Sequence, residues 1–157
     1  MKQAFTLIET VVAIGVFALL SVVGSILLFG ILRGSKKAAS VAVVRAEGAN
    51  IIYNMTGLLR FAQEIVSCNN TGIEFRPQFG DNIIYAFSSG LIASNSAAIS
   101  SNQVNVKNFS IACLPTGIPQ KIKIININFS LERKSPISVF DQAEIPFQTQ
   151  VVLRNRD

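Results

Sequence analysis

The feature that most constrains this chain is an apolar run of 28 residues, 5–32, in which Glu9 is the single charged side chain. At a rise of 1.5 Å per residue, a helix of this length would be about 42 Å long, whereas the hydrocarbon core of a bilayer is about 30 Å thick. The run is about twice as long as the apolar region of a cleaved secretory signal, and it leads directly into Arg33, Lys36 and Lys37. The sequence therefore predicts a helix that spans a membrane.

Glu9 is an unusual residue for such a helix. An ionisable group inside a membrane segment costs several kcal/mol unless it is neutralised, paired or in contact with water, so it indicates a functional role by default. The alternative is that Glu9, only five residues into the run, extends its carboxylate to the headgroups. Four glycines in and just beyond the run, Gly15, Gly24, Gly30 and Gly34, also have two interpretations. They permit close packing between membrane helices, or they let the helix bend or melt locally, since glycine costs about 1 kcal/mol relative to alanine.

The remaining composition limits the possible functions. The chain has 157 residues, enough for one modest domain plus an appended helix, and its mean hydropathy of +0.45 is high for a soluble protein. The net charge is +5, but beyond Lys37 the basic residues are mostly spread singly, so we expect no nucleic-acid partner. Histidine is absent and the two cysteines have no CxxC spacing, so we expect no metal site and no cofactor.

We also expect that the chain is not an enzyme. Nucleophilic catalysis would require a Ser/Lys or carboxylate pair, and no spacing indicates one. Glu132, Asp141 and Glu144 lie near one another in the sequence, and we interpret them as solvated charges linked by a turn.

The helical pattern continues beyond the basic cluster. Apolar residues recur at helical spacing and fall within a stripe about 140° wide, opposite the polar positions Arg45, Asn50, Arg60 and Glu64. The pattern predicts one helix from residue 5 to about residue 67, apolar all round in its first half and amphipathic over about 36–67. Turn residues at 68–72 are expected to end it.

Downstream the apolar period changes to two. Alternation predicts strands at 73–76, 81–91, 106–114, 121–133 and 145–153, whereas 92–105 is expected to be a loop or a weak strand. The apolar phase slips near Ile124, which predicts a bulge or burial on both faces there. Because strands follow strands without helical crossovers, we expect an α+β fold in which an antiparallel sheet over about 73–154 packs on the amphipathic half of the helix.

The first nine residues, Met-Lys-Gln-Ala-Phe-Thr-Leu-Ile-Glu, resemble the N-terminal signature of type IV prepilins: a short basic leader, a small residue, and FTLIE opening a long apolar helix. The resemblance implies that a prepilin peptidase cuts between Ala4 and Phe5 on the cytoplasmic side and N-methylates Phe5. It also implies an assembly role for Glu9. Residues 1–4 would then be a leader peptide, 5–32 a transmembrane and assembly helix, and 33–157 a pilin-like head.

This sequence departs from the signature at two points. Ala4 stands where glycine is more usual, which is expected to slow processing. The leader has one lysine, fewer than the three basic residues beyond the helix; large domains nevertheless translocate regardless of flanking charge, so we expect the N-terminus inside.

The order of elements is also similar to W-type minor pilins and J-type pseudopilins of type II secretion. The shared features are a helix ending in LLRFAQEIVS, an I-x-F strand, an I-x-Y strand closing at Gly90-Leu91, and a terminal strand ending in VVLRN. The resemblance implies a structural filament subunit of a bacterial pilus or pseudopilus, minor rather than major. Its partners would be other pilin subunits, the prepilin peptidase, the inner-membrane assembly machinery and membrane lipid. The alternative is a single-pass anchored extracytoplasmic binding domain that does not polymerise.

Whether the two cysteines form a disulfide depends on this topology. In an extracytoplasmic head Cys68 and Cys113 would form a disulfide between the end of the helix and a central strand, whereas in a reducing compartment they would be buried thiols. Four asparagines, Asn54, Asn69, Asn108 and Asn128, each begin an N-x-Ser/Thr triplet, which matters only if the host glycosylates the chain.

Overall fold

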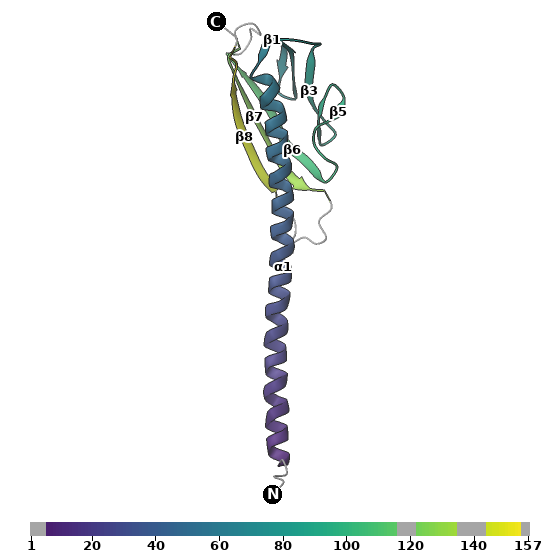
Figure 1. Cartoon of the computed structure of the whole chain (residues 1–157), viewed down its shortest axis with the longest axis vertical. Helices are drawn as coiled ribbons and strands as arrows, with labels where there is room; N and C mark the ends of the chain where they lie inside the picture. Colours follow the sequence, from purple (N-terminus) through teal and green to yellow (C-terminus); the bar gives the residue numbers. More distant parts are fainter. Residues whose placement is uncertain (1–5, 116–121, 135–143, 155–157) are drawn as a thin grey trace.

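The computed structural model describes residues 6–115, 122–134 and 144–154. Helix α1, Leu7–Leu59, is continuous over 53 residues. Its C-terminal part lies against a head of β-strands, and its N-terminal part extends alone as a stalk (Figure 1). The predicted α+β class, with one long N-terminal helix and antiparallel strands, is confirmed.

The described strands form two antiparallel sheets instead of the single sheet that was predicted. Their bounds are β1 Ala62–Asn69, β2 Gly72–Pro77, β3 Ile83–Ser88, β4 Leu91–Ser94, β5 Ala97–Ala98, β6 Val104–Leu114, β7 Ile124–Arg133 and β8 Glu144–Val152. The first sheet has the order β1-β2-β3-β4-β5 and the second the order β6-β7-β8. The first sheet ends at β5, a strand of only two residues, both exposed.

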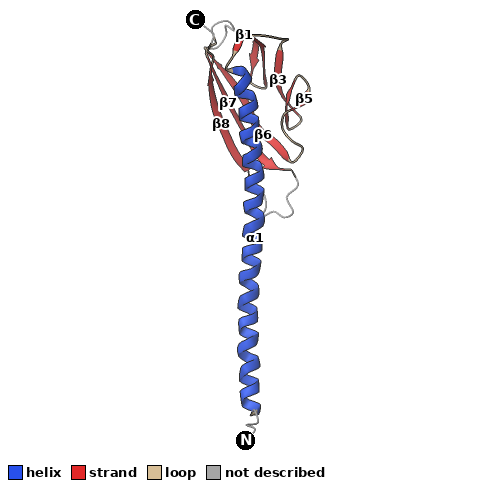
Figure 2. Cartoon of the chain, viewed as in Figure 1, coloured by secondary structure: helices blue, strands red, loops and turns tan. Residues whose placement is uncertain are grey.

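Helix α1 packs mainly across β7 and β8, and near its C-terminal end it also contacts β2 (Figure 2). The helix residues that this contact buries recur every three or four positions, as on one face of a helix. They are Ser40, Val44, Gly48, Ile51, Met55 and Leu59. The predicted amphipathic half is therefore present, but the head covers the helix only from Ser40 onward.

Gly48 is the closest point of approach between helix and sheet. A Cβ atom built at Gly48 would overlap the aromatic ring of Phe147 on β8. The Phe147 ring stacks on that of Phe129 with centroids 5.3 Å apart, and Phe129 is 3% exposed. The absent side chain of Gly48 thus creates a notch that seats the ring, a contact that the sequence analysis did not find.

The prediction that the helix continues to about residue 67 is wrong. α1 ends at Leu59, and after Arg60 and Phe61 the chain enters β1, which pairs with β2. The register of this pair shifts at two points, between Ala62 and Glu64 and between Ile65 and Ser67. Each irregularity adds a residue to one strand, so the inward-facing side chains follow a spacing of three, as on a helix.

The predicted turn at 68–72 consequently has another role. Cys68 and Asn69 are the last residues of β1, and Asn70 and Thr71 form the turn into β2. The strands therefore begin at residue 62 rather than at about 73. The segment 92–105, expected to be a loop or a weak strand, contains β5 and parts of β4 and β6.

The other predicted strands are present, except that the strand predicted over 81–91 ends at Ser88 and Leu91 begins β4. The phase slip near Ile124 is also explained. β7 begins at Ile124 and pairs in register there with both neighbours, so no bulge lies at this point. The slip reflects burial on both faces, since Ile124 is half-buried and Ile125 is fully buried. A register shift lies instead on β6 between Lys107 and Ser110, where Asn108 has φ 50°.

The two sheets are joined by a disulfide. Cys68 on β1 is bonded to Cys113 on β6, with Cα atoms 6.5 Å apart and a sequence separation of 45. The predicted pairing is present, but it links strand to strand rather than the helix end to a strand. The amide of Ile111 donates a hydrogen bond to the carbonyl of Asn70 (3.1 Å), and Phe87 stacks on Phe109 at 5.3 Å, so the sheets share one core.

Candidate assembly surface on the exposed half of the helix

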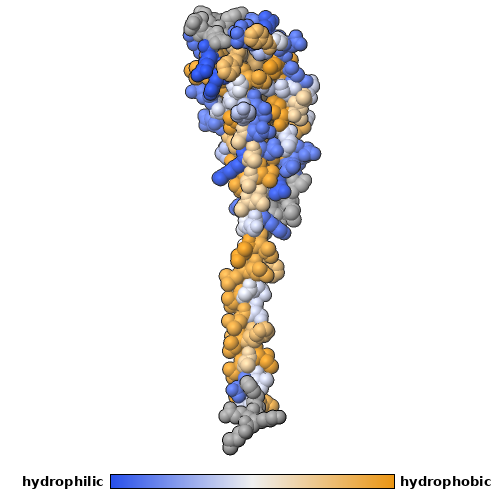
Figure 3. Space-filling model, in the orientation of Figure 1, coloured by the Kyte–Doolittle hydropathy of each residue, from blue (hydrophilic) through white to orange (hydrophobic). Residues whose placement is uncertain are grey.

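The N-terminal part of α1 is exposed and is not buried by any part of the head that the structure describes. Every described residue from 6 to 39 is exposed, including 17 large hydrophobic side chains between Leu7 and Leu32 that are 49–84% exposed. Figure 3 shows this contrast, with an apolar stalk below a head of mixed polarity. Burying a large apolar side chain stabilises it by about 1.5 kcal/mol or more, so on the order of 25 kcal/mol favours covering this surface. Lipid or other apolar helices could supply that cover.

By length and composition this helix could cross a membrane. Its most apolar 18-residue window has a mean hydropathy of 2.7, and none of that window is buried within the chain. Two serines in the apolar run are hydrogen-bonded within the helix itself. Ser21 Oγ donates to the Phe17 carbonyl and Ser25 Oγ to the Ser21 carbonyl, each at 2.8 Å. Neither serine therefore leaves its hydroxyl proton unpaired in an apolar surrounding.

Glu9 is the acidic residue in the first turn of α1. That position favours a carboxylate, because the amide groups at the N-terminal end of a helix carry partial positive charge. Beside it, Thr10 Oγ1 donates to the carbonyl of Thr6 at 3.0 Å. Among the residues that the structure describes, no cation pairs with Glu9. Ala4 and Phe5, the predicted cleavage and methylation site, lie outside the described residues.

Within the described residues, the four glycines of the stalk pack against no other part of the chain. A Cβ built at Gly15, Gly24, Gly30 or Gly34 would meet no atom within 4 Å, apart from the helix's own nearby backbone. α1 remains helical through all four. Packing against another helix and local melting during assembly both stay predictions.

Apart from the stalk, a cluster of polar residues lies on the outer face of the β6-β7-β8 sheet. Lys107 Nζ lies 2.6 Å from Glu132 Oε2, and Asn105 Nδ2 donates to Glu132 Oε1 at 3.1 Å. The hydrogen bond from Lys107 is the main cause that lowers the pKa of Glu132, and the same bond raises the pKa of Lys107. These contacts tie β6 to β7 on an open surface.

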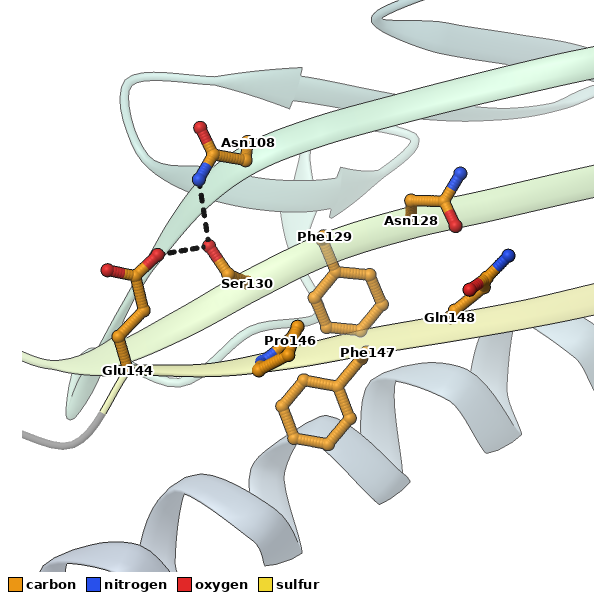
Figure 4. A pocket seen from close by; sticks show the side chains of 8 residues that line it. All are labelled: Asn108, Asn128, Phe129, Ser130, Glu144, Pro146, Phe147 and Gln148. Atoms are coloured by element: carbon orange, nitrogen blue, oxygen red, sulfur yellow. Dashed lines mark hydrogen bonds between the residues drawn. The ribbon is translucent and has the colours of Figure 1, made fainter.

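Glu144 is directly opposite Glu132 in the β7-β8 register, but it has its own partner. Ser130 Oγ donates to Glu144 Oε1 at 2.7 Å and accepts from Asn108 Nδ2 at 3.3 Å. Figure 4 shows this chain of hydrogen bonds, with the Phe147 ring directed toward the helix. These residues line an open depression of about 480 Å³. Of the three acidic residues interpreted as one charge group, Glu132 and Glu144 lie opposite each other and each bonds to its own neighbour, Lys107 and Ser130 respectively. Asp141 lies outside the described residues.

Tyr85 fixes the end of α1 to the first sheet. Its hydroxyl donates to the carbonyl of Asn54 at 3.2 Å, and its ring lies 5.5 Å from that of Phe75. Burial raises the pKa of Tyr85 to about 12. The predicted strand over 81–91 includes Tyr85, but no sequence pattern indicates its partner on the helix.

The described part of the head therefore packs on α1 from Ser40 to Leu59 and leaves residues 6–39 exposed. Glu9 lies in the first turn of this exposed part. No known family model, curated protein or solved structure shows significant similarity to this chain.

Proposed function

We propose that this chain is a structural subunit, of the minor kind, in a type IV pilus or a type II secretion-like pseudopilus. The observation that carries the proposal is the uncovered apolar half of α1, with Glu9 in its first turn, continuous with a half that is packed on an antiparallel head. An assembly subunit needs both parts, because the helix must leave the lipid and bury its surface against other helices while the head stays folded.

The proposed sequence of events begins in the cytoplasmic membrane. Lipid covers the stalk, the basic cluster Arg33, Lys36 and Lys37 lies at the far end of the apolar run, and the head is extracytoplasmic. A prepilin peptidase removes residues 1–4 and methylates the new terminus at Phe5. The inner-membrane assembly machinery then transfers the subunit into a filament, where helices of other subunits replace the lipid.

Glu9 would set the register of this transfer. After cleavage, the amine of Phe5 and the carboxylate of Glu9 are four residues apart, about 6 Å along the helix axis. A staggered neighbour can place its own amine against this carboxylate, which offsets the desolvation of both charges. An apolar seam alone tolerates sliding, so the charge pair makes the longitudinal position specific.

The decisive test is the mature N-terminus. Mass spectrometry of the protein extracted from membranes should show a chain that begins at N-methylated Phe5, and deletion of the prepilin peptidase should restore Met1. The alternative, an anchored binding domain that never polymerises, predicts an uncut chain. An intact Met1 in the wild type, or a start near residue 30, would contradict the proposal.

A further inference from the structure

The structure distinguishes sharply between the four N-x-Ser/Thr triplets. Asn54 lies within α1, where its Nδ2 donates to the carbonyl and to Oδ1 of Asn50 at 2.9 and 3.0 Å. Asn108 Nδ2 donates to Ser130 Oγ within the β6-β7 pair. Asn128 lies in the middle of β7, a strand paired on both sides. At each of these three positions the side-chain amide is already hydrogen-bonded or the backbone lies within a helix or a paired strand. A transferase therefore cannot bend the chain around the asparagine.

Asn69 differs because it stands at the end of a strand, where the chain already turns. It is the exposed last residue of β1, and the chain reverses immediately after it through Asn70 and Thr71 into β2. Asn69 Oδ1 accepts hydrogen bonds from the backbone amide of Thr71 at 3.0 Å and from Thr71 Oγ1 at 3.1 Å. Both bonds use the oxygen of the side chain. Its Nδ2 has no hydrogen-bond partner within the described part of the chain.

The turn is also held rigidly in this exposed position. Cys68, the preceding residue, is fixed to β6 by the disulfide. The carbonyl of Asn70 accepts from the amide of Ile111, and the amide of Phe87 donates to the carbonyl of Thr71 at 2.8 Å. The free amide and the hydroxyl two residues later therefore keep one geometry and stay accessible from solvent.

We propose that Asn69 is the acceptor of an N-linked glycan. This inference rests on the proposed function, because an extracytoplasmic head brings the turn to the membrane face where a lipid-linked sugar donor is presented. In the reaction, Nδ2 of Asn69 forms a bond to C1 of an oligosaccharide carried on a polyprenyl pyrophosphate. The bond from C1 to the pyrophosphate oxygen breaks, the pyrophosphate leaves with the bonding electrons, and one Nδ2 proton passes to a base of the transferase. Nothing is oxidised or reduced.

The test is peptide mapping by mass spectrometry of the full-length protein purified from its own cells. The peptide that contains Asn69 should have a sugar mass, and enzymatic release of the glycan should leave aspartate at this position. Asn69→Gln and Thr71→Val should abolish the modification, whereas Asn70→Gln, in the middle of the triplet, should retain it. Thr71→Ser keeps the hydroxyl and should also remain modified, and an intact disulfide in each variant shows that the head has folded.

The outcomes separate this inference from the proposed function. A chain that begins at Phe5 and has an unmodified Asn69 would overturn the glycan inference and leave the filament subunit standing. A glycan on Asn69 in a chain that begins at Met1 would do the reverse. A sugar mass that persists in Asn69→Gln would place the modification elsewhere and would likewise refute the assignment.

Discussion

Substitution of Gly48 by alanine tests the contact that positions the helix on the head. Alanine is favoured over glycine in a helix by about 1 kcal/mol, so on propensity alone the variant should be more stable. The structure predicts the opposite, because the new methyl group would occupy the position of the Phe147 ring. That ring is stacked on Phe129, which is buried, so it cannot move without separating from its neighbour.

The expected magnitude is the difference between two terms. Overpacking of a filled contact costs about 1–3 kcal/mol, or more where the displaced group has no space. After subtraction of the helix-propensity gain of about 1 kcal/mol, we expect Gly48→Ala to lose up to about 2 kcal/mol of stability. Gly57→Ala is the matched control, since this glycine is in the same helix and no atom lies within 4 Å of a Cβ built there. It should gain up to about 1 kcal/mol.

The assay is urea unfolding of a fragment that begins at residue 34, with circular dichroism as the signal that monitors unfolding. This fragment retains every helix residue that the head buries, because the first of them is Ser40. In the double variant Gly48→Ala/Phe147→Leu the smaller side chain relieves the overlap, so the two changes should couple favourably by about 1 kcal/mol. A Gly48→Ala variant that matches Gly57→Ala in stability would refute the notch.

Three further predictions follow from the head. Removal of the disulfide by Cys68→Ser/Cys113→Ser should cost about 4 kcal/mol on the chain-entropy estimate for a loop of 45 residues, measured as a lower urea midpoint; two free thiols in the native protein would contradict the bond. In a Tyr53→Phe background, absorbance titration should show Tyr85 ionising near pH 12, and ionisation near pH 10 would mean that its phenol is not buried. Because the pKa of Glu132 is lowered in the folded state, its contribution to stability is present above the unfolded pKa and is lost as pH falls through the folded value; Glu132→Gln should therefore flatten the acid limb of the stability-pH curve, and an unchanged limb would count against the Lys107 bond.

The sequence predicted the parts of this fold that depend on local periodicity. The apolar run, the amphipathic stripe and the alternation on β2, β3, β6 and β8 each follow from which residues face the core. The prediction failed at β1. Its irregular pairing with β2 buries Ala62 and Ile65, which are three residues apart, and a helix would bury side chains at the same spacing. Two sheets were taken for one because alternation reports the buried face of a strand and not its neighbour.

Some residues of the candidate site could likewise be predicted from the sequence and others could not. Glu9 was visible from sequence because a single charge in an apolar run is conspicuous whatever the tertiary structure. Gly48 was not, since a glycine in an amphipathic helix has no local signature and its partner Phe147 is almost 100 residues away in the chain. Turn geometry at Asn69 was likewise inaccessible while the region was interpreted as the end of a helix.

Glu9 gives the strongest test of the assembly role, because the two explanations given above, and a third in which any polar group suffices, predict different outcomes for its variants. If the carboxylate only reaches the headgroups, Glu9→Gln and Glu9→Val should both enter filaments as well as the wild type. If it pairs with the amine of a neighbouring Phe5, both variants should insert and be cleaved normally but should be depleted in sheared filaments relative to their membrane pool. If any polar group in the first turn suffices, Glu9→Gln should assemble and Glu9→Val should not. Thr10→Val is the control on the same turn. Within the described residues the Thr10 hydroxyl bonds to the carbonyl of Thr6, the N-cap of the same helix, so this variant should assemble normally. Undiminished incorporation of Glu9→Val would remove the charge pair from the proposal.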